Sequence, residues 1–341
     1  MIFDTPPQIP VVDVANMPTT IPGGLVIDSA TGDLYYNYNG SWYGITSTSK
    51  YVSPNIPGIG LFGAGSNGSY LSSTSIYTYA TNTAAIGGNL TYAAYYIAAT
   101  SNGTIGVFGG GNNGNTLSST SVYTYSSNTA ASGGNLSYAV WCEGATGNSS
   151  VGVYGAGAAP GTGVYLSSTT VYAYSTNTSS LGGNLNHYVD QLAAVGNSSL
   201  GVFGLGYYNA YLSATSIYTY STNSAVAGGN LTYSVYLPAA AGNGTIGVFG
   251  GGYNGSTLSY TSIYTYSTNT AVTGGNLSYG AYGLGATSNS TVGVFGNGYS
   301  TAYLSTTSVY TFSTNTSVAG GALTNTSDVG SACGPNPGVN C

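Results

Sequence analysis

Charged side chains are almost missing from this chain of 341 residues. It contains a single Lys or Arg, Lys50, and seven acidic residues, so charged residues make up 2 % of the sequence, whereas they make up about 25 % of an average soluble protein. Binding to nucleic acid requires clustered Lys or Arg to neutralise phosphates, so the composition excludes a nucleic-acid partner. The surface must instead be built from Ser, Thr, Asn, Gly and Tyr.

Histidine and cysteine are equally scarce. His187 is the only histidine, and the three cysteines, Cys142, Cys333 and Cys341, are scattered along the chain. A metal site of imidazole or thiolate ligands needs several such residues at short spacing, so we expect neither a metal nor another cofactor. We interpret Cys142, beside Trp141, as a small buried apolar residue rather than a nucleophile.

The last two cysteines are the one candidate disulfide. Cys333 and Cys341 are separated by the short segment GPNPGVN, and a bond between them would close a small terminal loop. The alternative is a pair of free thiols, which assembly in a reducing cytoplasm favours.

Long apolar runs are also missing. The chain has no run of 18 apolar residues that could cross a membrane, and residues 1–18 have neither the basic start nor the apolar run of a secretory signal. The composition is nevertheless typical of an exposed extracellular surface protein. A protein released by lysis of its host as part of a virus particle needs no signal peptide, so we expect a virion localisation without membrane insertion.

What the chain does contain is a strong repeat. Hydrophobic residues make up 42 % and aromatic residues 13 %, with 55 glycines and 35 tyrosines, which excludes ordinary disorder. A G-[VL]-[FY]-G string, a T-[ST]-[IV]-Y-[TA]-[YF] string and a Gly-Gly doublet each recur at steps of 46, 46, 49, 46 and 46 residues. Six copies, with G-[VL]-[FY]-G starting at residues 60, 106, 152, 201, 247 and 293, occupy residues 59–323. The one insertion, near Pro160, marks a surface loop.

Each copy divides into four short segments with strand patterns. TIGVFGGG is apolar on both faces, which indicates a strand covered on both sides, and LSSTSIYTYATN alternates. NLTYAAYYIAAT and NTAAIGGNL supply a further strand and a short outer strand. Four short strands per copy are typical of a β-propeller blade, so we predict an all-β fold with six blades. The main rival, a trimeric β-helix spike, would show a half-period of about 23 residues, which is missing.

The order of the markers resembles a known family. An apolar strand ending in GVFGGG, a variable loop, S-[IV]-Y-T-Y and then S-T-N-T resemble the Kelch repeat over residues 59–323, which implies a six-bladed Kelch-like propeller. The Trp expected after T-N-T is missing, and we expect Tyr to replace its contact between blades. The residues at its place are Ala84, Ala130, Ser179, Ala225, Ala271 and Ser317.

We expect the propeller to comprise residues 51–333, followed by a tail at 334–341. The segment YVSPNIP before the first copy is a poor strand because of its prolines. ALTNTSDVGSAC, after the last copy, is in register with NLTYAAYYIAAT. Residues 322–332 are therefore predicted to supply the missing strand of the first blade, which closes the ring and removes exposed sheet edges.

Residues 1–50 form a separate extension. Residues 1–22 are rich in proline and predict an extended arm, and residues 24–45 predict three short strands with turns at SATGD and Asn39-Gly40. An apolar strand, then D-x-x-T-G-D-L-Y, then N-G-S-W, resembles a module of bacteriophage tail fibres and other virion appendages, with a generic β-meander as the alternative. The resemblance implies attachment to other virion proteins through residues 1–50. Because so short an extension buries little, we expect it to dock on such a protein or on other copies in a homo-oligomer.

Glu143 and Asp190 are the candidate catalytic pair. Both fall on the corresponding segment of consecutive repeats, with His187 near Asp190. If that segment is the innermost strand, the two carboxylates line the channel, and two carboxylates are the minimum for glycoside hydrolysis. The alternative is a set of isolated polar residues at the channel mouth. No nucleophile motif or phosphate loop accompanies them, so we expect no enzyme and no catalytic residues.

Tyrosines on loops are the remaining functional feature. Their rings stack on sugar faces while hydroxyl and amide groups bind sugar hydroxyls. The candidates outside the strand pattern, all in the loop between the second and third strands, are Tyr70, Tyr165, Tyr207, Tyr208, Tyr211, Tyr253, Tyr299 and Tyr303. Fifteen N-x-[ST] sequons also occur, which we interpret mostly as turn chemistry.

The first hypothesis is a virion structural protein, a tail or capsid fibre whose propeller binds a host surface glycan. The second is a purely structural decoration protein. The third is a glycan-degrading enzyme that uses Glu143 and Asp190.

Overall fold

The computed structural model describes residues 58–161 and 164–334, together with four strands nearer the N-terminus. The chain divides into two units, residues 1–55 and 56–341. The smaller unit holds one sheet of β1 (Val11–Val12), β2 (Leu25–Asp28), β3 (Leu34–Tyr38) and β4 (Ser41–Gly44), in that order. The three predicted strands are present. The proline-rich segment adds β1, parallel to β2, and the two predicted turns lie outside the described residues.

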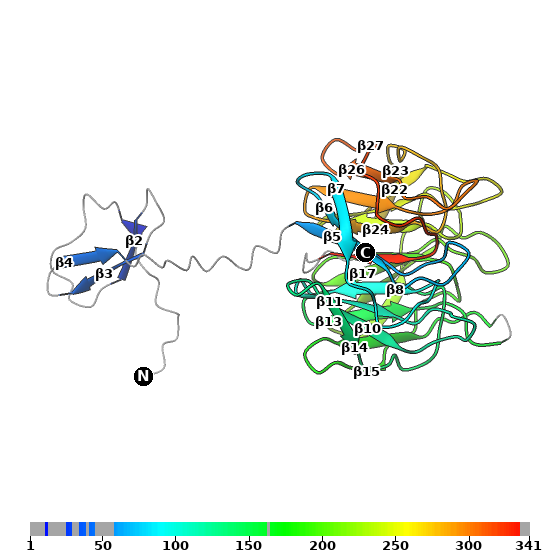
Figure 1. Ribbon diagram of the computed structural model, residues 1–341, viewed down its shortest axis with the longest axis horizontal. Helices are drawn as coiled ribbons and strands as arrows, with labels where there is room; N and C mark the ends of the chain where they lie inside the picture. The colour runs from blue at the N-terminus through cyan, green and yellow to red at the C-terminus, as the bar shows by residue number, and fades with distance from the viewer. Residues whose placement is uncertain are drawn as a thin grey trace. The chain divides into compact units, whose positions relative to one another are not determined.

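Six four-stranded antiparallel sheets form the blades of the larger unit, which is a six-bladed β-propeller (Figure 1). All regular elements described there are strands, so the predicted fold class is confirmed. From the channel outward, blade 1 consists of β28 (Ser331–Cys333), β5 (Ile59–Gly63), β6 (Thr74–Thr78) and β7 (Thr83–Gly87). Blade 2 consists of β8 (Ala98–Ser101), β9 (Ile105–Gly109), β10 (Thr120–Thr124) and β11 (Thr129–Ser132). Blade 3 consists of β12 (Gly144–Gly147), β13 (Val151–Gly155), β14 (Thr169–Ala173) and β15 (Thr178–Leu181). Blade 4 consists of β16 (Ala193–Gly196), β17 (Leu200–Gly204), β18 (Thr215–Thr219) and β19 (Ser224–Ala227). Blade 5 consists of β20 (Ala239–Gly242), β21 (Ile246–Gly250), β22 (Thr261–Thr265) and β23 (Thr270–Thr273). Blade 6 consists of β24 (Gly285–Ser288), β25 (Val292–Gly296), β26 (Thr307–Thr311) and β27 (Thr316–Ala319).

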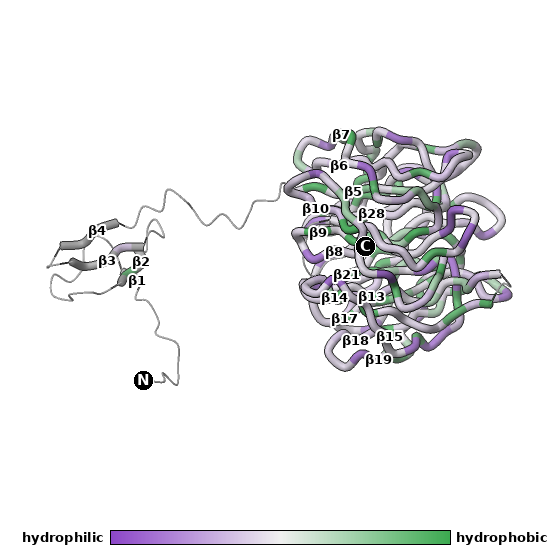
Figure 2. The backbone as a smooth tube through the Cα atoms, turned by 60° about the horizontal axis from the view of Figure 1, so that its bottom comes forward, coloured by the Kyte–Doolittle hydropathy of each residue, from purple (hydrophilic) through white to green (hydrophobic). Residues whose placement is uncertain are grey.

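The ring is closed by the end of the chain. β28 pairs antiparallel with β5, with Ala332 opposite Phe62, and the two strands lie side by side in Figure 2. The predicted closure of the first blade by the end of the chain is confirmed. The predicted segment 322–332 begins too early, because only its last two residues belong to β28. In every copy, the first part of NLTYAAYYIAAT and its equivalents is a loop, and only the last residues form the inner strand, as in β8.

Small and large residues alternate across the two inner strands of each blade. An alanine on the inner strand lies opposite a ring on the next strand, as Ala99 does opposite Phe108 and Ala145 opposite Tyr154. These alanines are buried in all six blades. Tight packing of this kind needs no charged side chains. In keeping with this, most of the propeller has intermediate hydropathy (Figure 2).

Neighbouring blades are joined through tyrosine. The first Tyr of each S-[IV]-Y string is at most 1 % exposed, and its hydroxyl donates to the side-chain oxygen of the Asn five residues later. That oxygen also accepts the N–H of the second glycine of the neighbouring blade's Gly-Gly doublet, at 2.7–3.2 Å. Tyr therefore contributes to the contact between neighbouring blades, as predicted.

Sequons at the turn between the first two strands of blades 2 to 6 are used by the backbone. The Asn side-chain oxygen accepts the N–H of the residue two positions later at 2.8–3.0 Å. These asparagines are Asn102, Asn148, Asn197, Asn243 and Asn289. For this set, turn chemistry explains the sequon, as predicted.

Candidate functional site

A closed ring of backbone hydrogen bonds surrounds one mouth of the central channel. Tyr96 donates its N–H to the carbonyl of Val329, Cys142 donates to Tyr96, and the pattern continues through all six blades at 2.7–3.1 Å. The six residues all have positive φ, between 44° and 64°, a conformation that bulky residues adopt rarely. They are Tyr96, Cys142, Gln191, Leu237, Gly283 and Val329. This ring of hydrogen bonds brings the six loops that precede the inner strands together at the channel mouth.

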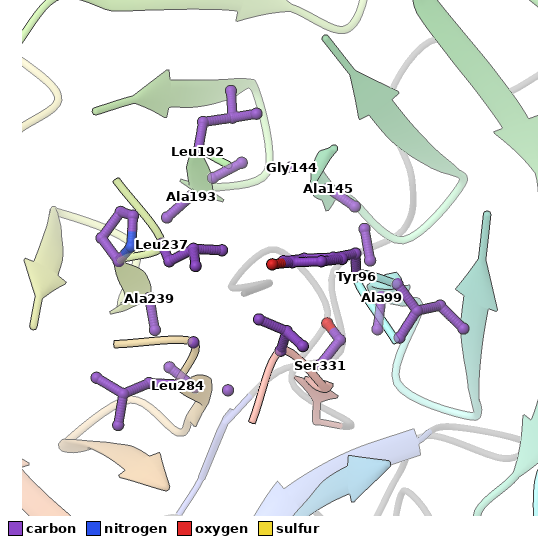
Figure 3. A pocket seen from close by; sticks show the side chains of 18 of the residues that line it. Tyr96, Ala99, Gly144, Ala145, Leu192, Ala193, Leu237, Ala239, Leu284 and Ser331 are labelled. Carbon is purple, nitrogen blue, oxygen red and sulfur yellow. The ribbon is translucent and has the colours of Figure 1, made fainter. Parts of the chain in front are cut away.

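The channel below this ring is nearly filled. The inner strands and the residues before them line a cavity of about 90 Å³, and Tyr96 lies across it with its hydroxyl near the middle (Figure 3). Such a cavity has room for a few water molecules and falls below the roughly 300 Å³ at which ligand pockets begin. The channel interior is therefore not a sugar site.

All three carboxylates of residues 56–341 lie at this mouth, and that unit contains no Lys or Arg. Glu143 is 6 % exposed, and neither oxygen of its carboxyl has a hydrogen-bond partner within the described residues. Burial raises its pKa well above the usual range. Desolvation likewise raises the pKa of Asp190 to about 7 and that of Asp328 to about 6.

The two candidate catalytic carboxylates do not occupy equivalent positions. Glu143 stands one residue before β12 and Asp190 stands three residues before β16, so neither is on the inner strand. The Glu143 carboxyl lies against blade 2. A Cβ added to Gly110 of that blade would be 2.0 Å from the Oε1 atom of Glu143. The true equivalent of Asp190 is Asp328, which belongs to the opposite side of the six-bladed ring. His187 is half-buried, and four other copies of the repeat have a tyrosine at the equivalent sequence position.

The structure brings seven of the eight candidate tyrosines together in one series of rings. Consecutive ring centroids lie 5.3–6.4 Å apart in a series from the loops of blades 3 to 6, which we call the tyrosine arc. In order, the arc consists of Tyr188, Tyr208, Tyr165, Tyr207, Tyr211, Tyr236, Tyr253, Tyr282, Tyr299 and Tyr303. Tyr70, the eighth candidate, belongs to a shorter series in which it stacks on Tyr95 at 5.4 Å, followed by Tyr96 and Trp141.

Sequence reasoning missed the aromatic residues of the loop before the inner strand. Tyr95, Trp141, Tyr236 and Tyr282 occupy one position in four copies, and Asp190 and Asp328 occupy it in the other two. Each pairs through its backbone with the loop between the second and third strands, as Tyr236 does with Tyr253. Their common spacing was the signal that could have found them.

A surface cleft of about 390 Å³ opens at one end of the arc, within the volume range of ligand pockets. Its walls are Val164, Tyr165, Tyr188, Tyr208 and Asn209. Tyr188 is 57 % and Tyr208 42 % exposed. Val164 and Tyr165 are the last residues of the insertion in the third copy. Because the other copies lack this insertion, the cleft is specific to this position in the ring.

No protein-family model matches the chain, and no curated protein sequence matches it. Within the ranges that the structure describes, no helix is long and apolar enough to span a membrane. The same ranges contain no group of three or more His, Cys, Asp and Glu that could hold a metal ion. Cys333 is a buried free thiol that accepts the Tyr125 hydroxyl at 3.3 Å. Its predicted disulfide partner, Cys341, lies outside the described residues.

Proposed function

We propose that the protein is a virion structural protein, a tail or capsid fibre, whose propeller binds a host surface glycan on the face that carries the tyrosine arc. The arc is the observation that carries this function. Ten phenol rings from four blades form one continuous series on loops held by the propeller, and three of them, Tyr188, Tyr208 and Tyr211, are exposed. Most of the eight tyrosines selected as loop candidates belong to it.

An uncharged sugar suits this face. Phenol rings offer flat apolar surface for the face of a pyranose, and hydroxyl and amide groups, such as Asn209 in the cleft, bind its hydroxyl groups. The unit has no Lys or Arg with which to hold an acidic polysaccharide. Several small contacts along one arc also suit a repeating glycan better than a single deep pocket would.

The assignment to a virion is supported by the sequence of the smaller unit and by composition. The order of strand, D-x-x-T-G-D-L-Y and N-G-S-W resembles virion appendage modules, and residues 1–50 would bind other virion proteins. The propeller itself is a diverged, Kelch-like one. The alternative within the same class is a decoration protein whose propeller contacts only neighbouring capsid or tail subunits.

Binding of the full-length protein to a glycan array and to host cells tests this function. We expect Tyr208→Ala and Tyr236→Ala to reduce glycan binding at least several-fold, because each removes one stacking ring. Tyr260→Ala is the matched control, since Tyr260 is 51 % exposed and outside the arc. A protein that assembles into virions but binds neither glycans nor cells would contradict the adhesin and favour the decoration protein.

The glycan-degrading alternative lacks a geometric argument. A glycosidase brings both carboxyl groups to the bond that it cleaves, whereas the Glu143 carboxyl is enclosed between blades 2 and 3. Release of reducing ends from a host polysaccharide, abolished in Glu143→Gln, would be needed to restore it.

A further inference from the structure

Asp190 is a buried acidic residue with one unpaired carboxyl oxygen at the edge of the tyrosine arc. Its side chain is 6 % exposed, and its Oδ1 has no hydrogen-bond partner in the described part of the chain. An orphaned buried polar atom is costly to leave unpaired. No Lys or Arg exists anywhere in residues 56–341, so neither residue type of this unit can neutralise the carboxylate.

The residues next to Asp190 connect it to the cleft. Its backbone pairs with Tyr207 in both directions, at 3.2 and 2.9 Å, and the Tyr207 ring lies 6.4 Å from that of Tyr165. Tyr165 in turn forms a wall of the cleft. Desolvation, and after it the negative charge of Asp190, raises the pKa of the Tyr165 phenol.

The rings of the cleft stand at different angles to one another. Tyr165 and Tyr208 are nearly perpendicular, at 86° with centroids 5.4 Å apart, and Tyr188 completes the set at 33° and 6.3 Å from Tyr208. Tyrosine rings that line one cleft in different orientations can offer an electronegative ring face to an ammonium group. A nearby unpaired carboxylate strengthens that preference.

We propose that the cleft of Val164, Tyr165, Tyr188, Tyr208 and Asn209, backed by Asp190, binds an ammonium group, either of an amino sugar or of a methylated ammonium compound. The proposal rests on the proposed function in that the cleft is one end of the tyrosine arc. It goes further by naming a cationic ligand for a face that otherwise suits neutral sugars.

Cation binding at this place is coupled to release of the Asp190 proton. Burial raises the pKa of Asp190 to about 7 in the free protein, and a bound cation favours the carboxylate, so affinity increases between pH 5 and 8. The other titratable groups near it are His187 on its own loop, the Tyr165 phenol, the Cys142 thiol and, beyond Cys142, Glu143. Burial raises the pKa of both Cys142 and Glu143.

The first experiment compares choline with its neutral isostere 3,3-dimethylbutan-1-ol by calorimetric titration of the full-length protein. We expect choline to bind about fivefold or more tightly than the isostere, and to bind more weakly at pH 5 than at pH 8. Asp190→Asn and Tyr208→Ala should each remove most of this preference. Asp328→Asn, at the equivalent position across the ring where Ser66 replaces Tyr207 as backbone partner, should leave it unchanged.

Equal binding of choline and the isostere, or equal loss in Asp190→Asn and Asp328→Asn, would overturn the proposal. A second comparison, protonated glucosamine against N-acetylglucosamine, distinguishes an amino sugar from a methylated ammonium compound. Neutral glycans that bind with no preference for ammonium would overturn this inference and leave the proposed function standing. Choline that binds while every glycan fails would support the inference and contradict glycan adhesion.

Discussion

The Tyr123 hydroxyl of β10 donates to the side-chain oxygen of Asn128, and that same oxygen accepts the N–H of Gly88 from blade 1 at 2.8 Å. One asparagine atom thus satisfies a buried phenol of its own blade and a backbone group of the next. The same contact recurs at every blade boundary, including the one between blades 6 and 1, where Gly321 donates to Asn82 at 2.9 Å. A propeller without ion pairs to Lys or Arg is held together in this way.

Replacing Asn128 with Ala should lower the free energy of unfolding by about 1–3 kcal/mol, because the buried Tyr123 hydroxyl loses its acceptor and the Gly88 N–H keeps only the Tyr123 hydroxyl, at 3.2 Å. The residue also has φ of 55°, which Asn tolerates better than Ala. Chemical denaturation measures the change.

Asn128→Gly separates the two causes, since Gly keeps the backbone freedom and removes the acceptor. We expect it to remain clearly destabilising. If the Gly variant unfolds like the wild type, the contact between blades contributes nothing and only backbone strain matters.

Gly88→Ala should lower stability by about 1–3 kcal/mol through overpacking. A Cβ at this position would lie 2.2 Å from the backbone oxygen of Asn128, which cannot move without opening the blade contact. Gly244→Ala is the control, because nothing lies within 4 Å of a Cβ there. Similar melting temperatures for the two variants would show that the doublet does not set the spacing between blades.

The six blades could be predicted from sequence because three markers keep one register through the chain, and each marker has a physical task. The Gly-Gly doublet admits Asn128 and its equivalents, and the buried Tyr of the second marker reaches that Asn. The boundaries of the inner strand could not be predicted in the same way. Tyr95 and Tyr96 continue the apolar pattern of β8, yet φ of 54° at Tyr96 turns the chain before the strand begins.

The site was predicted in part for a similar reason. Tyr165, Tyr207 and Tyr253 were recognisable as loop residues because they fall outside strand alternation. Tyr236 and Tyr282 were hidden, since they were assigned to a strand. Glu143 and Asp190 were paired because both were assigned to the corresponding strand of consecutive repeats. Both instead precede inner strands, and a difference of two residues in register sends one carboxyl between blades and leaves the other beside the arc.

Removing β28 should destabilise the ring. Truncation after Gly330 exposes the edge of β5 and uncovers the space filled by buried Ala332 and Cys333, so we expect a loss of several kcal/mol, or about 10 °C in melting temperature. Truncation after Gly334 keeps β28 and serves as the control. Equal melting temperatures for the two truncated chains would contradict closure by the last strand.

The propeller should be most stable in mild acid and lose stability as the pH rises. Burial raises the pKa of Asp190 to about 7, that of Asp328 to about 6 and that of Glu143 well above the usual range, whereas all three titrate near 4 in an unfolded chain. The folded protein therefore keeps protons that the unfolded chain has released, and stability is complete below about pH 4 and falls as the pH passes 6 and 7.

We expect the free energy of unfolding to decrease by about 1–3 kcal/mol between pH 5 and 8, because one retained proton contributes up to about 1.4 kcal/mol per pH unit. Thermal or chemical denaturation across this range measures it. The double variant Asp190→Asn, Asp328→Asn is the control and should make the decline smaller, since an amide has no proton to release and only Glu143 still contributes. Stability that rises between pH 5 and 8 would mean that these carboxyl groups are ionised in the folded protein, with hydrogen bonds or cations holding them so.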